Sequence, residues 1–370
     1  MKKVFLSVTN DIVTDQRVNR IASTLADNGL YVVIVGVKRK NSKEFSTETY
    51  QGVLLKSPFQ KGILFYSCFN FILFWYLLFR KTDVLVANDL DTLPANFLVS
   101  ILKRKVLIYD SHELFTEVPE IIHRPIVKKV WTYLEKLIIP HLKHNYTVCE
   151  SIAEIYSKTY KVPFSVVRNV PFRREKIEDR QQPEFKNKKI IIYQGALNIG
   201  RGIENAIKAM AYLENTQLLI AGRGDIENDL KLLVEKEKLQ DKVQFLGSLI
   251  PSKLFLYTSS ADLGFSLEQN IGLSYYYSLP NKLFDYIQAR IPVLVSNLPE
   301  MSAIVKQYNI GEISSSHEPE KLALQFKEML ANEQKRETWR KNLELAASEL
   351  CWENEKEKLV RIYRYAGVID

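Results

Sequence analysis

The segment with the most chemical content is Leu279–Tyr286, whose sequence is LPNKLFDY. Pro280 and Asn281 favour a helix start, which places Lys282 and Asp285 on one face of the helix. Free N–H groups at a helix start bind anions, and a carboxylate one turn further can accept hydrogen bonds from sugar hydroxyls. We therefore predict a binding site with Asn281 at its start, Lys282 on a diphosphate and Asp285 on a ribose. The alternative is a capped surface helix with a Lys–Asp ion pair.

Two glycine-bearing loops in the same half of the chain predict further phosphate contacts. The loop QGALNIGRG contains Gly195 and Arg201, and the loop AGRGD contains Gly222 and Gly224. Glycine lets backbone N–H groups approach a phosphate closely, and Arg201 adds a positive charge. The alternative is a pair of ordinary strand-to-helix turns with a solvated arginine.

The first half of the chain also places polar residues after its predicted strands. His112 follows a strand and lies among carboxylates, so we predict that it is a site residue. Asp89 and Asp91 have the spacing of a DxD metal motif, but carboxylates at a helix start also complement the helix dipole. We predict no metal. The first loop lacks GxGxxG, which disfavours a dinucleotide cofactor.

Short runs rich in Val, Ile and Leu alternate with longer helical patterns along the chain. Continuous apolar runs indicate strands buried on both faces, which is typical of parallel sheets with helices between the strands. Such sheets bind ligands beyond the carboxyl ends of their strands, where the polar segments above lie. The predicted strands are Val4–Val8, Tyr31–Val37, Asp83–Ala87, Lys105–Tyr109, Tyr146–Cys149, Ile190–Gln194, Gln217–Ala221, Val243–Leu246, Asp262–Ser266 and Pro292–Ser296.

The length of 370 residues favours two domains. Residues 171–188 are charged and poor in apolar side chains, so we predict a linker there. It separates a domain over residues 1–170 from a second over residues 189–349, and each is expected to be a doubly wound α/β domain.

Charge and cysteine content narrow the classes of partner and compartment. The chain has 51 Lys and Arg against 43 Asp and Glu, a net charge of +8, which favours an anionic partner. No basic-aromatic RNA-binding motif occurs, so nucleic acid is the least favoured of these partners. Cys68, Cys149 and Cys351 lie far apart without CxxC spacing, which indicates a reducing cytoplasm and no zinc site.

Residues 62–79 form an uncharged run of 18 residues, near the lower length limit of a membrane-spanning helix. Asn70 and the many aromatic residues favour a buried or interfacial helix, with a spanning or re-entrant helix as the alternative. An interfacial helix would bring its flanking cations to anionic lipid headgroups. These cations are Lys56, Lys61, Arg80 and Lys81.

Together these segments resemble the retaining nucleotide-sugar glycosyltransferases of the GT-B fold, the large group 1 family. The resemblance spans nearly the whole chain. Its motifs are DQRVNR (15–20), NDLDTLP (88–94), YDSHELFTE (109–117), GRGIE (200–204), AGRG (221–224), LPNKLFDY (279–286) and IPVLVS (291–296). It implies two Rossmann-like domains facing a cleft, with a C-terminal helix over residues 350–367 that returns to the first domain.

The resemblance also implies roles for the matched residues. Arg201 and Lys282 would stabilise the leaving diphosphate, and His112 would approach the donor sugar near its reacting carbon. The residues expected on the acceptor side are Asn10, Asp15, Asp89 and Glu117. The nucleoside diphosphate sugar is the donor substrate, and no cofactor is expected.

The activity so implied is retaining transfer of a sugar to a hydroxyl of a saccharide or lipid-linked saccharide. The expected setting is bacterial surface polysaccharide or lipid-linked glycan synthesis on the inner face of the cytoplasmic membrane, with an anionic membrane surface as a partner. Alternatives are a sugar-nucleotide 2-epimerase on the same fold and a non-catalytic, membrane-associated nucleotide-sugar-binding scaffold. The scaffold is motivated by Tyr277, which occupies the first Glu position of the family's E-x7-E signature. Whether Glu268 replaces that Glu stays open.

Overall fold

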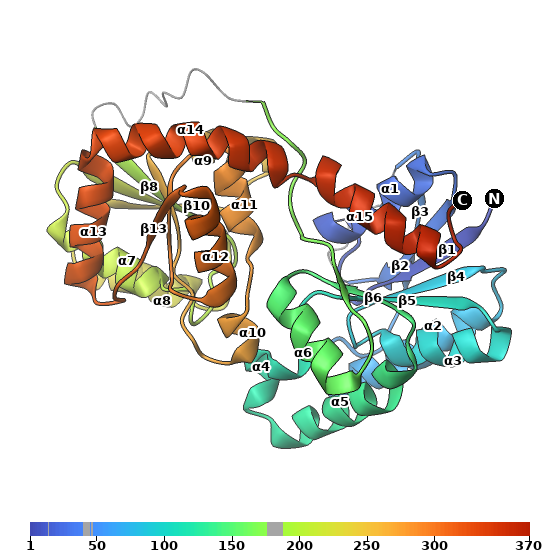
Figure 1. The fold of residues 1–370 in the computed structure, drawn as a ribbon. Helices are drawn as coiled ribbons and strands as arrows, with labels where there is room; N and C mark the ends of the chain where they lie inside the picture. The colour runs from blue at the N-terminus through green and yellow to red at the C-terminus, as the bar shows by residue number, and fades with distance from the viewer. Residues whose placement is uncertain (14, 40–44, 46, 176–187) are drawn as a thin grey trace. The chain divides into compact units, whose positions relative to one another are not determined.

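The computed structural model describes residues 1–13, 15–39, 45, 47–175 and 188–370. These residues form two compact units, Met1–Asn169 with Glu353–Asp370 and Val170–Trp352. Figure 1 shows that each unit is a sheet covered by helices. Residues 176–187 of the predicted linker lie outside the described residues.

The sheet of the first unit is parallel throughout, with the strand order β3-β2-β1-β4-β5-β6-β7. Its direction of winding reverses between β1 and β4, which is where doubly wound folds bind their ligands. The strands are β1 (Lys3–Ser7), β2 (Tyr31–Val37), β3 (Gln51–Leu55), β4 (Val84–Asn88), β5 (Val106–Ser111), β6 (His144–Thr147) and β7 (Ser165–Val166). The helices are α1 (Gln16–Asp27), α2 (Gly62–Leu78), α3 (Leu93–Lys103), α4 (Pro119–Ile122), α5 (Pro125–Ile138), α6 (Glu150–Tyr160) and α15 (Trp352–Tyr365), with short 3-10 turns η1 (Phe115–Glu117) and η2 (Ile139–His141).

The sheet of the second unit is also parallel, with the order β10-β9-β8-β11-β12-β13. This unit therefore reverses its winding between β8 and β11. Its strands are β8 (Lys189–Gln194), β9 (Thr216–Ala221), β10 (Val243–Gly247), β11 (Leu263–Ser266), β12 (Val293–Val295) and β13 (Gly311–Ile313). Its helices are α7 (Ile203–Ala209), α8 (Glu227–Lys236), α9 (Pro251–Ser260), α10 (Leu273–Tyr276), α11 (Asn281–Gln288), α12 (Pro299–Tyr308), α13 (Pro319–Ala331) and α14 (Glu333–Glu349), and a 3-10 turn η4 spans Met210–Tyr212.

The C-terminal helix α15 packs into the first unit, so both chain ends lie there (Figure 1). Lys2 Nζ donates to the carbonyl of Gly367 at 2.7 Å. The buried carboxylate of Glu355 accepts from the backbone N–H of Arg168 at 3.0 Å. The predicted fold class, two doubly wound α/β domains with a returning C-terminal helix, is confirmed in each unit taken by itself.

Helix α2 occupies most of the uncharged run, over 17 residues. Phe65, Phe69, Leu73 and Leu77 recur every four residues and form its buried face. No helix in the described part of the chain is both long and apolar enough to cross a membrane.

Candidate functional site

The cations predicted to hold a diphosphate converge in the second unit on one buried carboxylate. Lys282, in the first turn of α11, is 7% exposed, and its Nζ lies 2.6 Å from Glu268 Oε1. The same ammonium donates to the hydroxyl of Tyr193 at 3.3 Å and lies over its ring. Arg201, in the loop after β8, lies 3.4 Å from the same Glu268 oxygen and stacks over the ring of Tyr275. Arg201 and Lys282 are therefore neighbours across one carboxylate.

Glu268 is fully buried just beyond β11. Burial alone would raise its pKa, but Lys282 and Arg201 outweigh burial and lower the pKa. The hydroxyl of Ser266 donates to its second oxygen at 2.6 Å. Two cations and one carboxylate leave this cluster with one net positive charge. The sequence left the role of Glu268 open, and the structure places it between the two predicted donor-site cations.

The two glycine loops lie against each other at the ends of β8 and β9. The N–H of Gly195 donates to the carbonyl of Ala221 at 3.0 Å. A Cβ on Gly222, where φ is +148°, would lie 1.8 Å from the carbonyl oxygen of Gly195. A Cβ on Gly224 would lie 2.3 Å from the carbonyl oxygen of Leu197. Both of these glycines are thus required by loop packing, whether or not a phosphate binds.

Asp285, one turn after Lys282 on α11, accepts from Gln194 Nε2 at 2.7 Å. The hydroxyl of Thr258 donates to Gln194 Oε1 at 2.6 Å, so the amide orientation of Gln194 is fixed. Asn281 lies exposed at the start of the same helix. The predicted donor-site residues therefore gather at the carboxyl ends of the strands of the second sheet.

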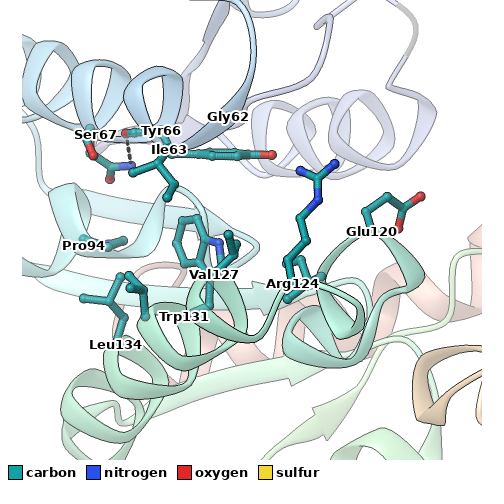
Figure 2. A pocket seen from close by; sticks show the side chains of 13 residues that line it. Gly62, Ile63, Tyr66, Ser67, Pro94, Glu120, Arg124, Val127, Trp131 and Leu134 are labelled. Carbon is teal, nitrogen blue, oxygen red and sulfur yellow. Dashed lines mark hydrogen bonds between the residues drawn. The ribbon is translucent and has the colours of Figure 1, made fainter.

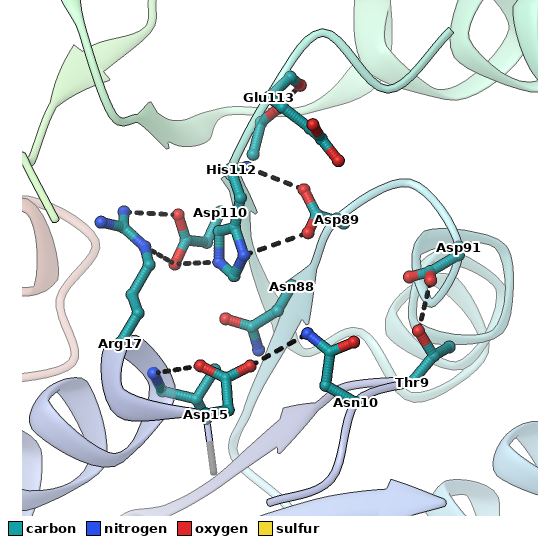
Figure 3. A network of polar contacts seen from close by, with 12 residues as sticks. Thr9, Asn10, Asp15, Arg17, Asn88, Asp89, Asp91, Asp110, His112 and Glu113 are labelled. Atoms are coloured by element: carbon teal, nitrogen blue, oxygen red, sulfur yellow. Dashed lines mark hydrogen bonds and ion pairs between the residues drawn. The ribbon is translucent and has the colours of Figure 1, made fainter. Parts of the chain in front are cut away.

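A second polar network lies at the carboxyl ends of β1, β4 and β5 in the first unit (Figure 3). His112 lies between two carboxylates: Nδ1 is 3.0 Å from Asp89 and Nε2 is 3.2 Å from Asp110. Arg17 donates to both oxygens of Asp110, at 2.7 and 3.0 Å. The backbone N–H of His112 donates to Asp89 at 2.7 Å. The ring of His112 is thus held on both sides.

The charges of this network determine its protonation. Burial would raise the pKa of Asp110, but Arg17 and His112 outweigh it and lower that pKa to about 2. Burial would lower the pKa of His112, but Asp89 and Asp110 outweigh it and raise that pKa well above 6.5. His112 is therefore an imidazolium whose two N–H groups point at protein carboxylates. It can act on a ligand through its fixed charge.

The predicted acceptor-side residues divide into two groups. Asn10 donates to Asp15 at 3.2 Å, and Asp15 also caps α1 by accepting from the N–H of Val18 (Figure 3). Asn10, Asp15 and Asp89 thus lie with the His112 network. Glu117 does not appear in that network, and its carboxylate lies 2.6 Å from Lys128 on α5.

The DxD pair does not converge on one point. The carboxylate of Asp89 faces His112, whereas the buried carboxylate of Asp91 accepts from the hydroxyl of Thr9. Burial, and then the charge of Asp89, raise the pKa of Asp91 to about 7. Within the residues that the structure describes, no cluster of three His, Cys, Asp or Glu side chains is placed to hold a metal ion.

Arg17 and Asp110 were missed as site residues by the sequence reasoning. Asp110 ends the buried strand β5, and Arg17 begins the buried face of α1. A charged residue at each of these two buried positions is the signal that could have indicated the pair.

Residues 175–345 match the model of the family described as Glycosyl transferases group 1. An uncharacterized glycosyltransferase of Methanocaldococcus jannaschii, MJ1607, is 26% identical over 205 residues, which are 52% of this chain and 49% of that protein. The alpha-monoglucosyldiacylglycerol synthase of Streptococcus pneumoniae is 24% identical over 155 residues, 38% of this chain and 33% of that enzyme. The chain thus spans half or less of the length of these two relatives.

The structure of Anabaena Alr3699/HepE in complex with UDP and glucose has the same fold, with a TM-score of 0.77. Its identity to this chain is 14%, with 99% of this chain and 100% of that chain covered. With its two Rossmann-like units of parallel sheet, the chain has the GT-B fold. Within that fold class, residues 175–345 of the chain match the group 1 glycosyl transferases.

Proposed function

We propose that the protein transfers a sugar from a nucleoside diphosphate sugar to an acceptor hydroxyl, with retention at the anomeric carbon. The observation that supports this most strongly is the pair Arg201 and Lys282, held beside each other by the buried Glu268. Preorganised cations stabilise charge that develops on a leaving group, and their geometry requires no rearrangement during reaction. On this proposal the leaving group is the nucleoside diphosphate, and Asp285 binds its ribose.

We also propose a saccharide or lipid-linked saccharide acceptor, used at the inner face of a bacterial cytoplasmic membrane. The outer face of α2 supports it, because Phe71 and Trp75 are exposed there although they are large and apolar. The name of the S. pneumoniae relative, which refers to a glucosylated diacylglycerol, agrees with a lipid acceptor. His112 and its carboxylates would border the reacting sugar. We expect no metal or cofactor.

The test is turnover of UDP- and GDP-sugars by the wild type and by Lys282→Met, followed as release of the nucleoside diphosphate. Lys341→Met is the matched control, because Lys341 is an exposed lysine on α14 of the same unit. We expect Lys282→Met to lose about 100-fold in rate, and the control to match the wild type. Near-normal turnover in Lys282→Met contradicts the proposal.

Incubation with the donor alone, and then with added saccharide acceptors, separates the alternatives. A donor epimerised at C2 would identify a 2-epimerase, and saturable donor binding without turnover on any acceptor would identify a binding scaffold. Release of nucleoside diphosphate with a new α- or β-linked product of unchanged configuration supports the retaining transfer.

A further inference from the structure

An apolar groove of about 520 Å³ lies in the first unit between α2, α4 and α5. Its size falls within the range of about 300–1,000 Å³ that is typical of small-molecule sites. Tyr66 and Trp131 both line this groove (Figure 2), and their rings meet edge to face with centroids 5.3 Å apart. Ile63, Val127 and Leu134 add aliphatic surface. The groove therefore suits a hydrocarbon chain.

The inner wall of the groove is hydrogen-bonded to the loop after β4, which is predicted to lie on the acceptor side. Asn70 lines the groove and donates to the backbone carbonyl of Asp91 at 2.7 Å. The side chain of Asn70 also accepts from the N–H of Ala95 at 3.2 Å. Pro94, from the same segment, lines the groove as well. A chain bound here thus lies against the loop that carries Asp89 and Asp91.

The opposite end of the groove is polar. Arg124 and Glu120 lie beside each other there, and Arg124 is exposed with no ion pair to any residue the structure describes (Figure 2). Lys61 directly precedes Gly62, which lines the groove, so two cations, Lys61 and Arg124, stand here against the one carboxylate of Glu120. This charge complements a lipid whose headgroup carries a phosphate.

The helices around the groove also expose apolar side chains to solvent. On the first turn of α2, Ile63 is 55% exposed and Leu64 is 61% exposed. On α5, Ile126, Val130 and Leu137 are exposed. An exposed apolar patch beside an apolar groove is typical of a binding surface.

We propose that this groove holds the hydrocarbon chain of a lipid-phosphate acceptor, with its phosphate near Arg124. This inference rests on the proposed glycosyl transfer. It adds a chain-binding site to the acceptor side and names the substrate class as lipid phosphates. The hydrocarbon chain would then lie against the loop after β4, and the phosphate end of the molecule would leave the groove beside Arg124.

The test is a calorimetric titration of the full chain with decyl phosphate below its micelle concentration. Decanol and inorganic phosphate are titrated separately, to distinguish the contributions of the chain and the phosphate. The variants are Ile63→Glu and the matched control Leu64→Glu. Both residues are exposed aliphatic side chains on the first turn of α2, but only Ile63 lines the groove.

We expect saturable binding of decyl phosphate, weaker binding of decanol and no binding of inorganic phosphate. Ile63→Glu places a carboxylate in the groove and should weaken decyl phosphate binding by about tenfold or more, whereas Leu64→Glu should change it less than about twofold. Equal weakening in both variants, or no saturable binding, overturns the proposal. Dimerisation of the protein that decyl phosphate does not reverse would assign the groove to a second copy instead.

Failure of this inference and failure of the proposed function give different results. If the wild type releases nucleoside diphosphate from donor sugars but does not bind decyl phosphate, only the groove assignment fails. If it binds decyl phosphate but no nucleoside diphosphate, the transfer proposal fails.

Discussion

At the scale of single residues, the two cations of the proposed donor site contact a carboxylate that local sequence spacing does not connect to them. Lys282 and Asp285 could be predicted because a helix start sets their geometry within one turn. Glu268 is 14 positions before Lys282 in the chain, and it meets Arg201 and Lys282 only through the packing of β11, α11 and the loop after β8. Spacing within one helix or loop could not show that contact.

Replacing Glu268 by Gln tests this arrangement. The change removes one partner from a buried charge cluster, so we expect the free energy of unfolding to fall by about 3 kcal/mol. Pyrophosphate should restore more stability to Glu268→Gln than to the wild type, because the variant has two uncompensated cations. Thermal melts with and without pyrophosphate measure both effects. A variant that melts like the wild type would show that Glu268 does not hold the cations.

The raised pKa of His112 predicts the direction in which the free energy of unfolding changes with pH. Its pKa is raised in the folded protein by Asp89 and Asp110, which outweigh burial. Its contribution to stability is therefore fully present below the unfolded pKa of about 6.5 and is lost as the pH rises through the folded pKa. Urea unfolding of the wild type and His112→Gln from pH 6 to pH 9 measures this contribution.

We expect the stability advantage of the wild type over His112→Gln to shrink as the pH rises over that range. The matched control is His123→Gln, at an exposed histidine in the same unit. A constant difference between wild type and His112→Gln would contradict the imidazolium assignment.

At the scale of elements, the strands that the sequence predicts are those with long apolar runs. The three that it missed are β3, β7 and β13, which all lie at sheet edges. β7 and β13 are only two and three residues long, and β3 has no fully buried residue. Edge strands bury less apolar surface, so their sequences carry a weaker pattern.

The close contact between the two glycine loops predicts that adding a side chain at Gly222 destabilises the protein. Gly222→Ala forces a Cβ into the carbonyl of Gly195, so we expect a loss of about 3 kcal/mol or more from overpacking and backbone strain. Gly247→Ala is the control, because Gly247 also has a positive φ of +65° but has open space around its Cβ position. That control should lose only about 1 kcal/mol. Equal losses in urea unfolding would mean that the loop contact contributes nothing.

At the scale of the whole molecule, composition and strand pattern were sufficient to predict two doubly wound units. The prediction that the C-terminal helix returns to the first unit came from the family resemblance. The sequence of an amphipathic helix does not indicate which surface the helix packs against. The structure provides that surface through Glu355 and Tyr363, both buried in the first unit.

Two tyrosines on α15 test this long-range packing. Tyr363 is fully buried and Tyr365 is 86% exposed on the same helix. We expect Tyr363→Ala to destabilise the protein by about 3–5 kcal/mol, and Tyr365→Ala to change stability by less than about 0.5 kcal/mol. Similar melting temperatures for the two variants would show that α15 adds little to the stability of the first unit.

The central claim is that Arg201 and Lys282 form a binding site for a nucleoside diphosphate. The most direct measurement is a calorimetric titration of the wild type, Lys282→Met and Lys341→Met with UDP and with GDP. We predict one-to-one binding of at least one of them, weakened about tenfold or more in Lys282→Met and unchanged in Lys341→Met. Absence of binding by the wild type, or equal affinity in wild type and Lys282→Met, would contradict the account.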